Sequence, residues 1–519
     1  MKMIKKILKA FIGFLITVTA VFLVAFYWPM PTIDVPEVHQ NILIRSVNII
    51  DVESGEVVYN QDVLIVGNRI VSIDSAETNR MIADEYVVKG KGKYLMPGLW
   101  NMHNHSTQYA KWLYHPLQIA YGVTGVRDMS GQLGRHDSYW AGTKERKRWN
   151  EEVNRNLSVS PRTVLQSSFQ IDGSSSVPDD FPAYFKLENE EDALPLLKYY
   201  KDDGTDFIKV YMNIPAASYR RLAIEAPKLG MHIAGHKPLN ISLEESILLG
   251  QRSFEHGRIF MYDCFSGAEK LRDPANRGKR FKLPKEAMIQ TFDDERAAEL
   301  MTLMSDHDAH WVPTLQTLKM GAYANDEIFR SNEHLKYIPT IRKMAWWNPD
   351  INRYADSSIV DSEENIEMKF YRAAQRQVAM ANERGVSIMM GTDVTDTYVF
   401  PGYSAHVELL DLTLSGLSNH DALRAATIIS AKYCGAEKEQ GSVEIGKLAD
   451  MIMLDNNPLE NIEHTQTING VFLNGIYYDK SKLEDLKEGT SSLASSFHMN
   501  VKIMFSLINS PLMRVQFAD

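Results

Sequence analysis

Eight short apolar segments recur between residues 99 and 393, and this recurrence constrains the fold more than any other feature of the chain. Helical stretches such as residues 243–250 separate many of them, which is typical of parallel strands joined by helices. Eight such strands over roughly 340 residues predict an α/β fold, a (β/α)₈ TIM barrel with insertions. The predicted strands are residues 99–103, 123–129, 162–166, 207–212, 231–236, 252–256, 310–315 and 386–393.

Two β-rich segments flank the predicted barrel, which covers residues 97–439. Residues 38–96 contain short strands with turns, and residues 440–480 contain strands again. We expect these two segments to form one small β-sandwich from both chain ends. The stretch 316–383 is longer than one crossover needs, so extra helices, which can serve as a lid, are expected there. Residues 481–519 form a C-terminal tail, either an amphipathic appendage or a segment packed on the barrel.

Residues 1–30 have the composition of a membrane anchor. Four lysines precede an uncharged run from Ala10 to Trp28, which as a helix is about 28 Å long and close to the bilayer core in thickness. Tyr27 and Trp28 close the run as interfacial aromatic residues do, and the lysines favour a cytoplasmic N-terminus. A Pro-rich linker, 29–36, follows. The residues that follow the run are therefore expected outside the cytoplasm, on the periplasmic side in a Gram-negative cell.

A cleaved signal peptide is the alternative interpretation of the same residues, and it would give a secreted protein. The apolar core of a signal peptide is usually shorter and ends in an A-x-A-like cleavage site. No such site follows the run in this sequence. The uncleaved anchor is therefore the favoured prediction.

Composition excludes several classes of function. The net charge is −10, and beyond the N-terminus no dense basic cluster occurs, so no nucleic-acid partner is expected. The chain has two cysteines, Cys264 and Cys434, which make neither a disulfide framework nor a cysteine-based zinc site. Histidines and carboxylates must therefore hold any metal ion.

Metal-ligating residue types collect at the C-terminal ends of the predicted strands, where a TIM barrel has its active site. His103 and His105 stand two residues apart, so they face the same side of a strand and both can reach one metal. A single histidine at a strand end is more often a core residue whose hydrogen bonds are satisfied within the protein. The prediction of a metal site therefore depends on the joint occurrence of several such residues at strand ends. The other candidates at strand ends are His236, His256 and Asp393.

Lys209 lies within the fourth predicted strand, between Ile208 and Val210. A lysine with such neighbours is normally exposed on an edge strand, because burial of an ammonium group is costly. A lysine that faces a barrel interior therefore needs a special reason. Reaction with carbon dioxide provides one, since a carbamate is a carboxylate-like group that can bridge two cations.

Several segments resemble the amidohydrolase superfamily. PGLWNMHNH is similar to its signature P-G-hydrophobic-hydrophobic-D-x-H-x-H. YGVTGVRDMSG, FIKVYM, GHKPLNISLEESILLGQRSFEHG and GTD follow the pattern of its imidazolonepropionase-like and prolidase-like members, as does the segment from PGYSAH to PLENI. The resemblance covers about residues 41–478. Asn101 departs from it, since an Asp is more usual there, and this exchange is expected to adjust the site without removing it.

The resemblance implies a two-metal site. His103, His105 and Asp393 would hold the more buried metal ion, and His236 with His256 would hold the more exposed one. Carbamylated Lys209 and a hydroxide would bridge the two ions. Zinc is the expected metal because histidine and carboxylate ligands suit it, with manganese, cobalt and iron as alternatives. Asp393 would also move the proton from the attacking water to the leaving group.

The expected reaction is hydrolysis of an amide-type C–N bond in a cyclic amide, a dipeptide or an N-acyl amino acid, other than ordinary protein peptide bonds. An esterase, lactonase or phosphotriesterase on the same centre is an alternative, as is a non-catalytic membrane-tethered barrel. A mononuclear deaminase is disfavoured, because the first glutamate after His236 is Glu244 and because Lys209 has no role in such a mechanism. A small-molecule substrate is expected, and a homo-oligomer is compatible with the sequence.

Two further residues are candidates for substrate contact. Tyr211 follows Lys209 by two positions and is expected to face the substrate. His406 either faces the pocket or orders a loop at the start of a helix, and the sequence favours neither. Arg127 and Asp128 end the second predicted strand and are expected to form a structural ion pair rather than a substrate clamp.

Overall fold

The computed structural model describes residues 2–76, 85–174, 177–276, 284–357 and 365–518. Parts of the predicted segments 38–96, 97–439 and 316–383 lie outside the described residues, as do residues 1 and 519 of the two predicted terminal segments.

Parallel strands form the core of the molecule, in two sheets of the predicted barrel. The first has the order β6-β7-β8 and the second the order β12-β11-β10-β9. Each of these strands begins within one residue of the start of a predicted strand. Their bounds are β6 Leu99–Asn104, β7 Val123–Asp128, β8 Arg162–Gln166, β9 Phe207–Val210, β10 His232–Gly235, β11 Ser253–Glu255 and β12 His310–Val312.

Backbone hydrogen bonds close the ring of strands at two places. Between β8 and β9, the Ser168 amide donates to the Phe207 carbonyl at 2.9 Å. The predicted eighth strand, 386–393, has no regular strand geometry but occupies the eighth position. There the Met389 amide donates to the Trp311 carbonyl at 2.9 Å, and the Met102 amide of β6 donates to the Met390 carbonyl at 2.8 Å. The barrel is thus predicted correctly, with its last strand irregular.

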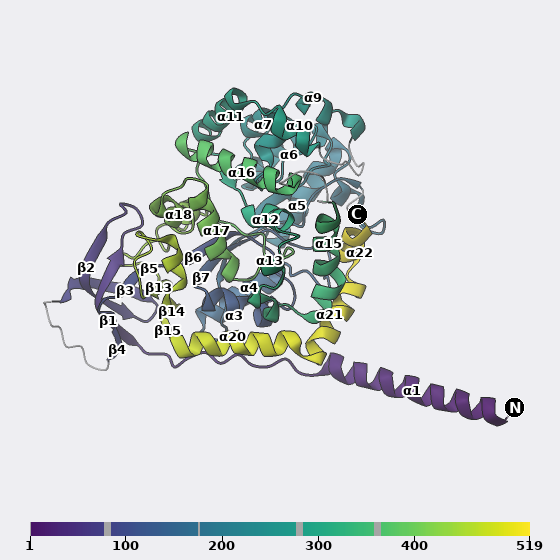
Figure 1. Cartoon of the computed structure of the whole chain (residues 1–519), viewed down its shortest axis with the longest axis horizontal. Helices are drawn as coiled ribbons and strands as arrows, with labels where there is room; N and C mark the ends of the chain where they lie inside the picture. The colour runs from purple at the N-terminus through teal and green to yellow at the C-terminus, as the bar shows by residue number, and fades with distance from the viewer. Residues whose placement is uncertain (1, 77–84, 175–176, 277–283, 358–364, 519) are drawn as a thin grey trace.

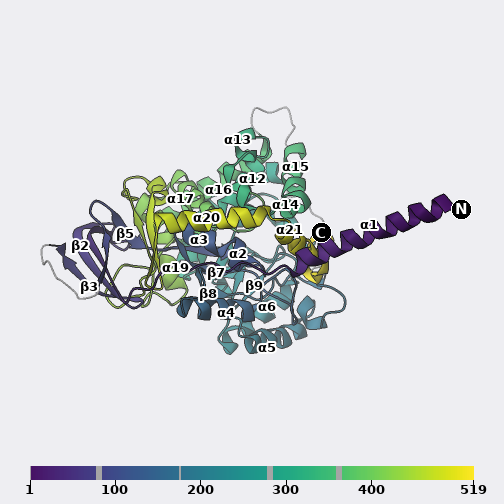
Figure 2. The same ribbon diagram turned by 90° about the horizontal axis from the view of Figure 1, so that it is seen from below.

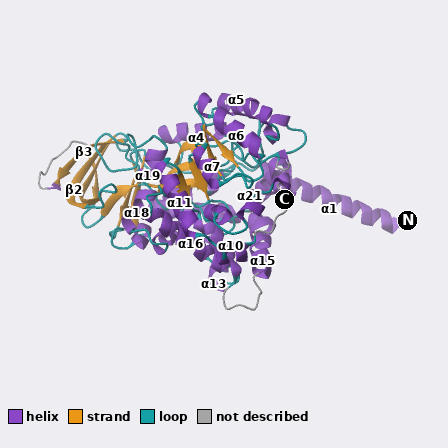
Figure 3. Ribbon diagram, turned by 90° about the horizontal axis from the view of Figure 1, so that it is seen from above, coloured by secondary structure: helices purple, strands orange, loops and turns teal. Residues whose placement is uncertain are grey.

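Helices surround these strands (Figure 3). In α16, Ile366–Glu383, the Asn365 side chain caps the first turn by accepting from the Met368 amide. Apolar positions such as Phe370 and Ala374 recur at helical spacing and are buried, which sets the face that packs on the barrel. The other helices of the barrel region are α2 Ala110–Leu113, α3 His115–Ala120, α4 Thr143–Asn154, α5 Ala193–Asp203, α6 Ala216–Glu225, α7 Leu243–Leu248, α8 Ile259–Asp263, α9 Ala268–Leu271, α10 Lys285–Gln290, α11 Asp294–Asp306, α17 Tyr403–Leu414, α18 Asn419–Ala425 and α19 Ile428–Tyr433.

The stretch 316–383 holds extra helices, as predicted. Besides α16 it contains a π-helix at Lys343–Trp347. The remaining helices that lie wholly or partly in the stretch are α12 Leu315–Ala322, α13 Glu327–Arg330, α14 Thr340–Arg342 and α15 Asn348–Ser357.

Strands from both chain ends form one mixed sheet at one end of the molecule (Figure 1). β5 pairs antiparallel with β13, and this pairing joins the two chain ends. A second sheet layer, which a sandwich requires, stays a prediction. The order is β15-β14-β13-β5-β1-β2-β3 with β4 beside β1, and the bounds are β1 Asn41–Ile50, β2 Val57–Val66, β3 Arg69–Ser75, β4 Glu85–Lys89, β5 Tyr94–Pro97, β13 Met451–Leu454, β14 Ile468–Leu473 and β15 Ile476–Asp479.

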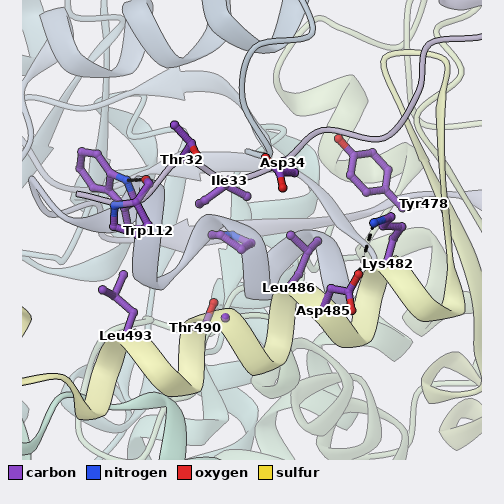
Figure 4. A pocket seen from close by; sticks show the side chains of 13 residues that line it. Thr32, Ile33, Asp34, Trp112, Tyr478, Lys482, Asp485, Leu486, Thr490 and Leu493 are labelled. Carbon is purple, nitrogen blue, oxygen red and sulfur yellow. Dashed lines mark hydrogen bonds and ion pairs between the residues drawn. The ribbon is translucent and has the colours of Figure 1, made fainter. Parts of the chain in front are cut away.

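Helix α1, Lys2–Tyr27, projects from the end of the molecule opposite this sheet (Figures 1 and 2). Among the described residues, it is the helix long and apolar enough to cross a membrane, over Met3–Tyr27. The predicted linker then runs along α20, Lys480–Ser495, and leaves a cavity of about 230 Å³ against that helix (Figure 4). The tail continues into α21, Phe497–Asn509, and α22, Pro511–Ala518, so it is a helical segment packed on the barrel.

Candidate active site

Asp393 lies at the centre of the predicted ligands. Its Oδ1 is 3.1 Å from Nε2 of His105 and 3.3 Å from Nε2 of His103. Its Oδ2 is 3.7 Å from Nδ1 of His256. Three histidines from two strand ends therefore converge on one carboxylate.

The other two predicted ligands adjoin this group. Nε2 of His236 is 2.9 Å from Nε2 of His256, and Nζ of Lys209 is 3.4 Å from Nε2 of His105. All six predicted ligands thus lie in one cluster. The ligand atoms of His103, His256 and Asp393 all lie within 4.8 Å of one another, and the expected assignment divides these three residues between two metals. The assignment of each residue to one of two metals stays a prediction.

Strand ends and unusual backbone angles aim these side chains. His103 is on β6 and His105 follows its last residue, Asn104, so both point from the end of one strand. His256 and Asp393 have φ angles of 74° and 64°, in the left-handed region that side chains other than glycine rarely adopt. Such strained residues persist where the surrounding structure holds them, and they cluster at functional sites.

A chain of hydrogen bonds beneath the cluster holds His103 in place. Nδ1 of His103 is 2.8 Å from Oε2 of Glu255, and Nη2 of Arg127 donates to Oε1 of Glu255 at 2.8 Å. The Ser253 hydroxyl also donates to Oε1 of Glu255, at 2.7 Å, and accepts from Nη1 of Arg127 at 2.7 Å. These four residues, here named the buried network, direct Nε2 of His103 toward Asp393.

The pKa shifts in the cluster indicate that Glu255 is ionised and that three of the histidines are neutral. Burial alone would raise the pKa of Glu255, but Arg127 and the His103 hydrogen bond lower it to about 2. Burial lowers the pKa of His105 to about 4 and the pKa values of His236 and His256 well below their usual range. These three rings are therefore neutral at pH 7, and each offers a lone pair.

Lys209 faces the barrel interior and not solvent. Its side chain is 2% exposed. Burial lowers the pKa of its ammonium to about 8, although Asp393 and Glu255 act in the opposite direction. The ammonium form still dominates at pH 7, but the neutral amine is far more abundant than in an exposed lysine.

The cluster fits divalent cations by its donor chemistry. Nε2 of His103 is buried and makes no hydrogen bond within the described residues, and it points to the Asp393 carboxylate. A buried nitrogen without a partner is costly, and a metal ion would satisfy it. The hydrogen bond from its other ring nitrogen to Glu255 is the support that metal-binding histidines usually have.

Two adjoining cavities, of about 310 and 320 Å³, open onto the cluster. Both are lined by Tyr211, Trp346, Asp393 and Asp396. Burial and the nearby carboxylates of Asp393 and Asp350 raise the pKa of Asp396 to about 7. Tyr211 stacks on His236 with a ring separation of 3.9 Å, so it lies where a substrate contact was predicted, and that role stays a prediction.

Arg258 differs from the other cations that line the second cavity. Lys285 pairs with Glu367 at 2.5 Å, and Arg353 pairs with Asp350 at 2.6 Å. The guanidinium of Arg258 makes no hydrogen bond or ion pair within the part of the chain that the structure describes. It lies beside His256 and leaves an unpaired positive charge next to the cluster.

His406 does not line either cavity. Its Nε2 donates to the Tyr121 carbonyl at 3.0 Å, and its Nδ1 is 2.9 Å from the Thr465 hydroxyl. The ring therefore joins α17 to α3 and to the 3₁₀ helix Ile462–Gln466. Of the two predicted roles, these hydrogen bonds favour the ordering of a loop, and the substrate contact stays a prediction.

Arg127 and Asp128 are both structural, but they do not pair with each other. Arg127 pairs with Glu255 at 2.8 Å, and Asp128 lies 3.3 Å from the guanidinium of Arg146. The expected ion pair is therefore wrong in its partners, because side chains of adjacent strand residues point to opposite faces. Asn101 donates to the Thr392 hydroxyl at 2.8 Å and accepts from the His103 amide, so it joins β6 to the closing segment.

The sequence did not reveal the roles of Glu255 and Arg258. Glu255 directly precedes His256, and it stands two positions after Ser253 on the same face of β11. A carboxylate on the inward face of a strand was the signal that could have identified it. No such signal in the sequence could have identified the unpaired charge of Arg258. Whether that charge has a partner depends on which residues neutralise the cations around it.

The amidohydrolase family model matches residues 291–477. Comparison with curated proteins gave no match. Similar solved structures include a Xaa-Pro dipeptidase with methionine bound in its active site (19% identity, TM-score 0.58, 85% of this chain and 100% of that one). Others are bottromycin amidohydrolase (19%, 0.66, 91% and 93%) and molinate hydrolase (16%, 0.57, 86% and 96%). At these identities the structural likeness shows the fold alone.

Proposed function

We propose that this chain, a member of the amidohydrolase superfamily, hydrolyses an amide-type C–N bond in a small substrate with a free carboxylate, at a two-metal site. The family match confirms the predicted superfamily and the prediction of an enzyme. The observation that carries the proposal is the convergence of three histidines on Asp393, with His236 and Lys209 adjoining them and one buried histidine nitrogen left without a hydrogen bond.

Two divalent cations fit the six predicted ligands, with zinc as the first expectation. When bound, such cations lower the pKa of a water molecule and polarise a substrate carbonyl. The predicted ligands are His103, His105, Lys209, His236, His256 and Asp393.

Lys209 would take part as a carbamate. Its neutral amine attacks carbon dioxide, a C–N bond forms, and one proton leaves to solvent. The product carries a carboxylate-like group in place of an ammonium. This change of sign removes a repulsion of roughly 4 kcal/mol per pair of unit charges at 4 Å with an effective dielectric constant of 20. The buried position of Lys209 and its lowered pKa support this modification.

Asp393 would move the proton during the reaction. Burial would raise its pKa, but the adjacent histidines, first His103, lower it well below the usual range. The carboxylate is therefore ionised and able to accept a proton from the attacking water. It can then deliver that proton to the departing nitrogen, which must leave as a neutral amine.

Arg258 favours substrates that carry a carboxylate. Its unpaired guanidinium lines the cavity beside His256, and a carboxylate is the group that matches the guanidinium fork best. Dipeptides and N-acyl amino acids both have one, which favours these two classes over cyclic amides. Trp346 and Tyr211 complete a partly aromatic wall that would exclude water from the bound substrate.

The test is elemental analysis after metal-replete expression, combined with a substrate screen. Two metals per chain and turnover of dipeptides or N-acyl amino acids are expected. Amides of the same substrates, which lack the carboxylate, should be poor. Preferred turnover of lactones or phosphotriesters would support the alternative reaction on the same centre, and a chain with no metal and no turnover would favour a non-catalytic barrel.

We further propose that α1 is an uncleaved anchor that holds the barrel outside the cytoplasm. Its apolar length and the absence of charge between Ala10 and Trp28 support this location. A mature chain that starts beyond residue 28 and fractionates as a soluble protein would instead support a cleaved signal peptide.

A further inference from the structure

Helix α21 is packed against the outer end of α1. The rings of Phe22 and Phe497 are 5.5 Å apart, and those of Phe26 and Phe505 are 5.1 Å apart. Nζ of Lys502 also donates to the Phe26 carbonyl. The last turns of α1 are therefore fixed to the tail of the same chain (Figure 1).

The opposite side of α21 is attached to the barrel. Met499 and Ile503 are buried in an apolar cluster with residues of α2 and α4. The Ile341 amide donates to Oδ1 of Asn500 at 2.8 Å, and the Ser138 hydroxyl donates to the Ser506 carbonyl at 2.7 Å. Helix α21 thus lies between α1 and the body of the enzyme.

A neighbouring face of α21, which includes Phe497 of the α1 contact, is apolar and largely exposed. Phe497 is 53% exposed and Ile508 is 60% exposed, while Met504 is partly exposed. These residues are spaced by seven and four positions, which places them on one face of a helix. Residues 497–518 contain no Asp or Glu, although the whole chain has a net charge of −10. Such a face suits a lipid surface better than water.

The depth of this face follows from α1. Phe22 precedes Tyr27 by five residues, which is about 8 Å along a helix. If Tyr27 and Trp28 mark the outer end of the membrane span, the contact between Phe22 and Phe497 lies about that far inside it. Amphipathic helices at an interface bury their apolar face by roughly 5–10 Å. The two depths agree.

From these contacts we infer that α21 is an interfacial helix, seated in the outer leaflet of the bilayer that α1 spans. The inference rests on the proposed anchor. It commits to a phospholipid bilayer as the occupant of the face formed by Phe497, Met504 and Ile508. The chain would then have two membrane contacts, one that crosses the bilayer and one that lies in its surface.

This seating has a consequence for the active site. Ile341, which binds Asn500 of α21, directly precedes Arg342, and Arg342 lines the first cavity. Ser138, which binds Ser506, is two residues before Trp140 of the same cavity wall. The wall is therefore separated from lipid by one helix, roughly 10 Å in diameter. The enzyme would work on small substrates at the membrane surface.

Photolabelling of the full chain tests the inference. The protein is reconstituted in vesicles of phosphatidylethanolamine and phosphatidylglycerol that contain a phospholipid with a carbene-generating group in its acyl chain. Labelled peptides are mapped by mass spectrometry after photolysis. Label is expected in α1 and in Phe497–Asn509. The exposed apolar residues Ile224 and Ile328 of α6 and α13 should stay unlabelled, although Ile328 is 85% exposed.

Two variants sharpen the result. F497S/I508S should lose most of the label in α21 and keep the label in α1, whereas the matched control I224S/I328S should change neither. Label in α1 without label in α21 of the unaltered chain would overturn the inference and leave the anchor standing. Absence of label from α1 would overturn both. Turnover of dipeptides or N-acyl amino acids by the same vesicles tests the proposed reaction separately.

Discussion

The buried network beneath the ligand cluster and the second cavity beside that cluster each contain an arginine. The two arginines differ in whether the protein neutralises their charge. In the network, Arg127 is fully buried and bonded to Glu255, Ser253 and the Met102 carbonyl. In the cavity, Arg258 lies next to the same cluster and makes no ion pair or hydrogen bond within the described residues. One cation is completely neutralised by the protein, and the other is left for something else to neutralise.

This difference separates two tasks of the site. A fully bonded network holds His103 in one orientation and tautomer before any ligand arrives, which is the preorganisation that catalysis needs. An unpaired cation at the cavity wall gains a partner only when a substrate binds. We therefore expect the network to govern metal binding and the cavity to govern substrate choice, and substitutions on the two sides should have different signatures.

The largest effect is expected at the cluster itself, from K209A. Removal of the proposed bridging group should abolish metal binding and activity together, beyond the roughly 100-fold loss that follows removal of a supporting partner. K209R should fail as well, because arginine keeps its charge and forms no carbamate at ordinary pH. Elemental analysis and turnover of each variant provide the measurement. Normal metal content and turnover in K209R would refute the bridge and favour a mononuclear mechanism.

A rescue experiment serves as its control. Short carboxylic acids, or bicarbonate with a short amine, should restore part of the metal content and activity of K209A by filling the gap. In the unaltered chain, burial lowers the pKa of Lys209 to about 8, so its reactive neutral form increases as the pH rises through that value. At fixed dissolved carbon dioxide, the rate at which metal-free protein recovers activity should rise by about tenfold from pH 7 to pH 9.

The next effect is expected in the buried network, from E255Q. The exchange removes the negative charge that holds Nδ1 of His103, and metal affinity should fall by about 10–100-fold. The Michaelis constant of metal-saturated enzyme should change little, because Glu255 does not line either cavity. Titration with a chelator measures the affinity. The double variant R127M/E255Q is the control for the buried charge that E255Q leaves on Arg127.

R258M, a substitution in the second cavity, should show the opposite pattern to E255Q. Metal content should be normal, while kcat/KM for a substrate with a carboxylate falls by about 10–100-fold, as expected for loss of a hydrogen bond to a charged group of roughly 1.5–3 kcal/mol. The same substrate as its amide should be unaffected. R353M is the matched control, since Arg353 lines the same cavity but already pairs with Asp350. Equal losses in both variants would contradict the assigned role of Arg258.

The sequence predicted what depends on local pattern. Strands β6 to β12 follow from short apolar runs between helices, and the six predicted ligands follow from residue types within or at the ends of these strands. The closing segment 386–393 was predicted as a regular strand, yet it forms an isolated β-bridge at Ile388, and Asp393 has a φ angle of 64°, which departs from strand geometry at the predicted ligand. Local pattern indicates a strand there, and the demands of the site override it.

Features that depend on distant partners were not predictable in the same way. Arg127 and Asp128 looked like a pair because they are adjacent in the sequence, but their partners are 128 and 18 positions away, at Glu255 and Arg146. The partner of His406 at Thr465 comes from the second β-rich segment. Only the folded chain brings these residues together, so neither composition nor spacing identifies them.

The smallest effect on catalysis is expected at His406, which belongs to neither side of the comparison. H406F removes the donor to the Tyr121 carbonyl and leaves that part-buried oxygen without its partner. The free energy of unfolding should therefore fall by about 1–3 kcal/mol. Because the ring lies outside both cavities, kcat/KM of the folded fraction should stay within about twofold of the unaltered enzyme. H406Q can keep a donor at this position and should recover part of the lost stability.

Denaturant unfolding and steady-state kinetics on the same preparations separate the two roles that the sequence left open. A raised Michaelis constant with unchanged stability would return His406 to the substrate site, whereas lost stability with unchanged kinetics assigns it to the contact between α17 and the 3₁₀ helix Ile462–Gln466.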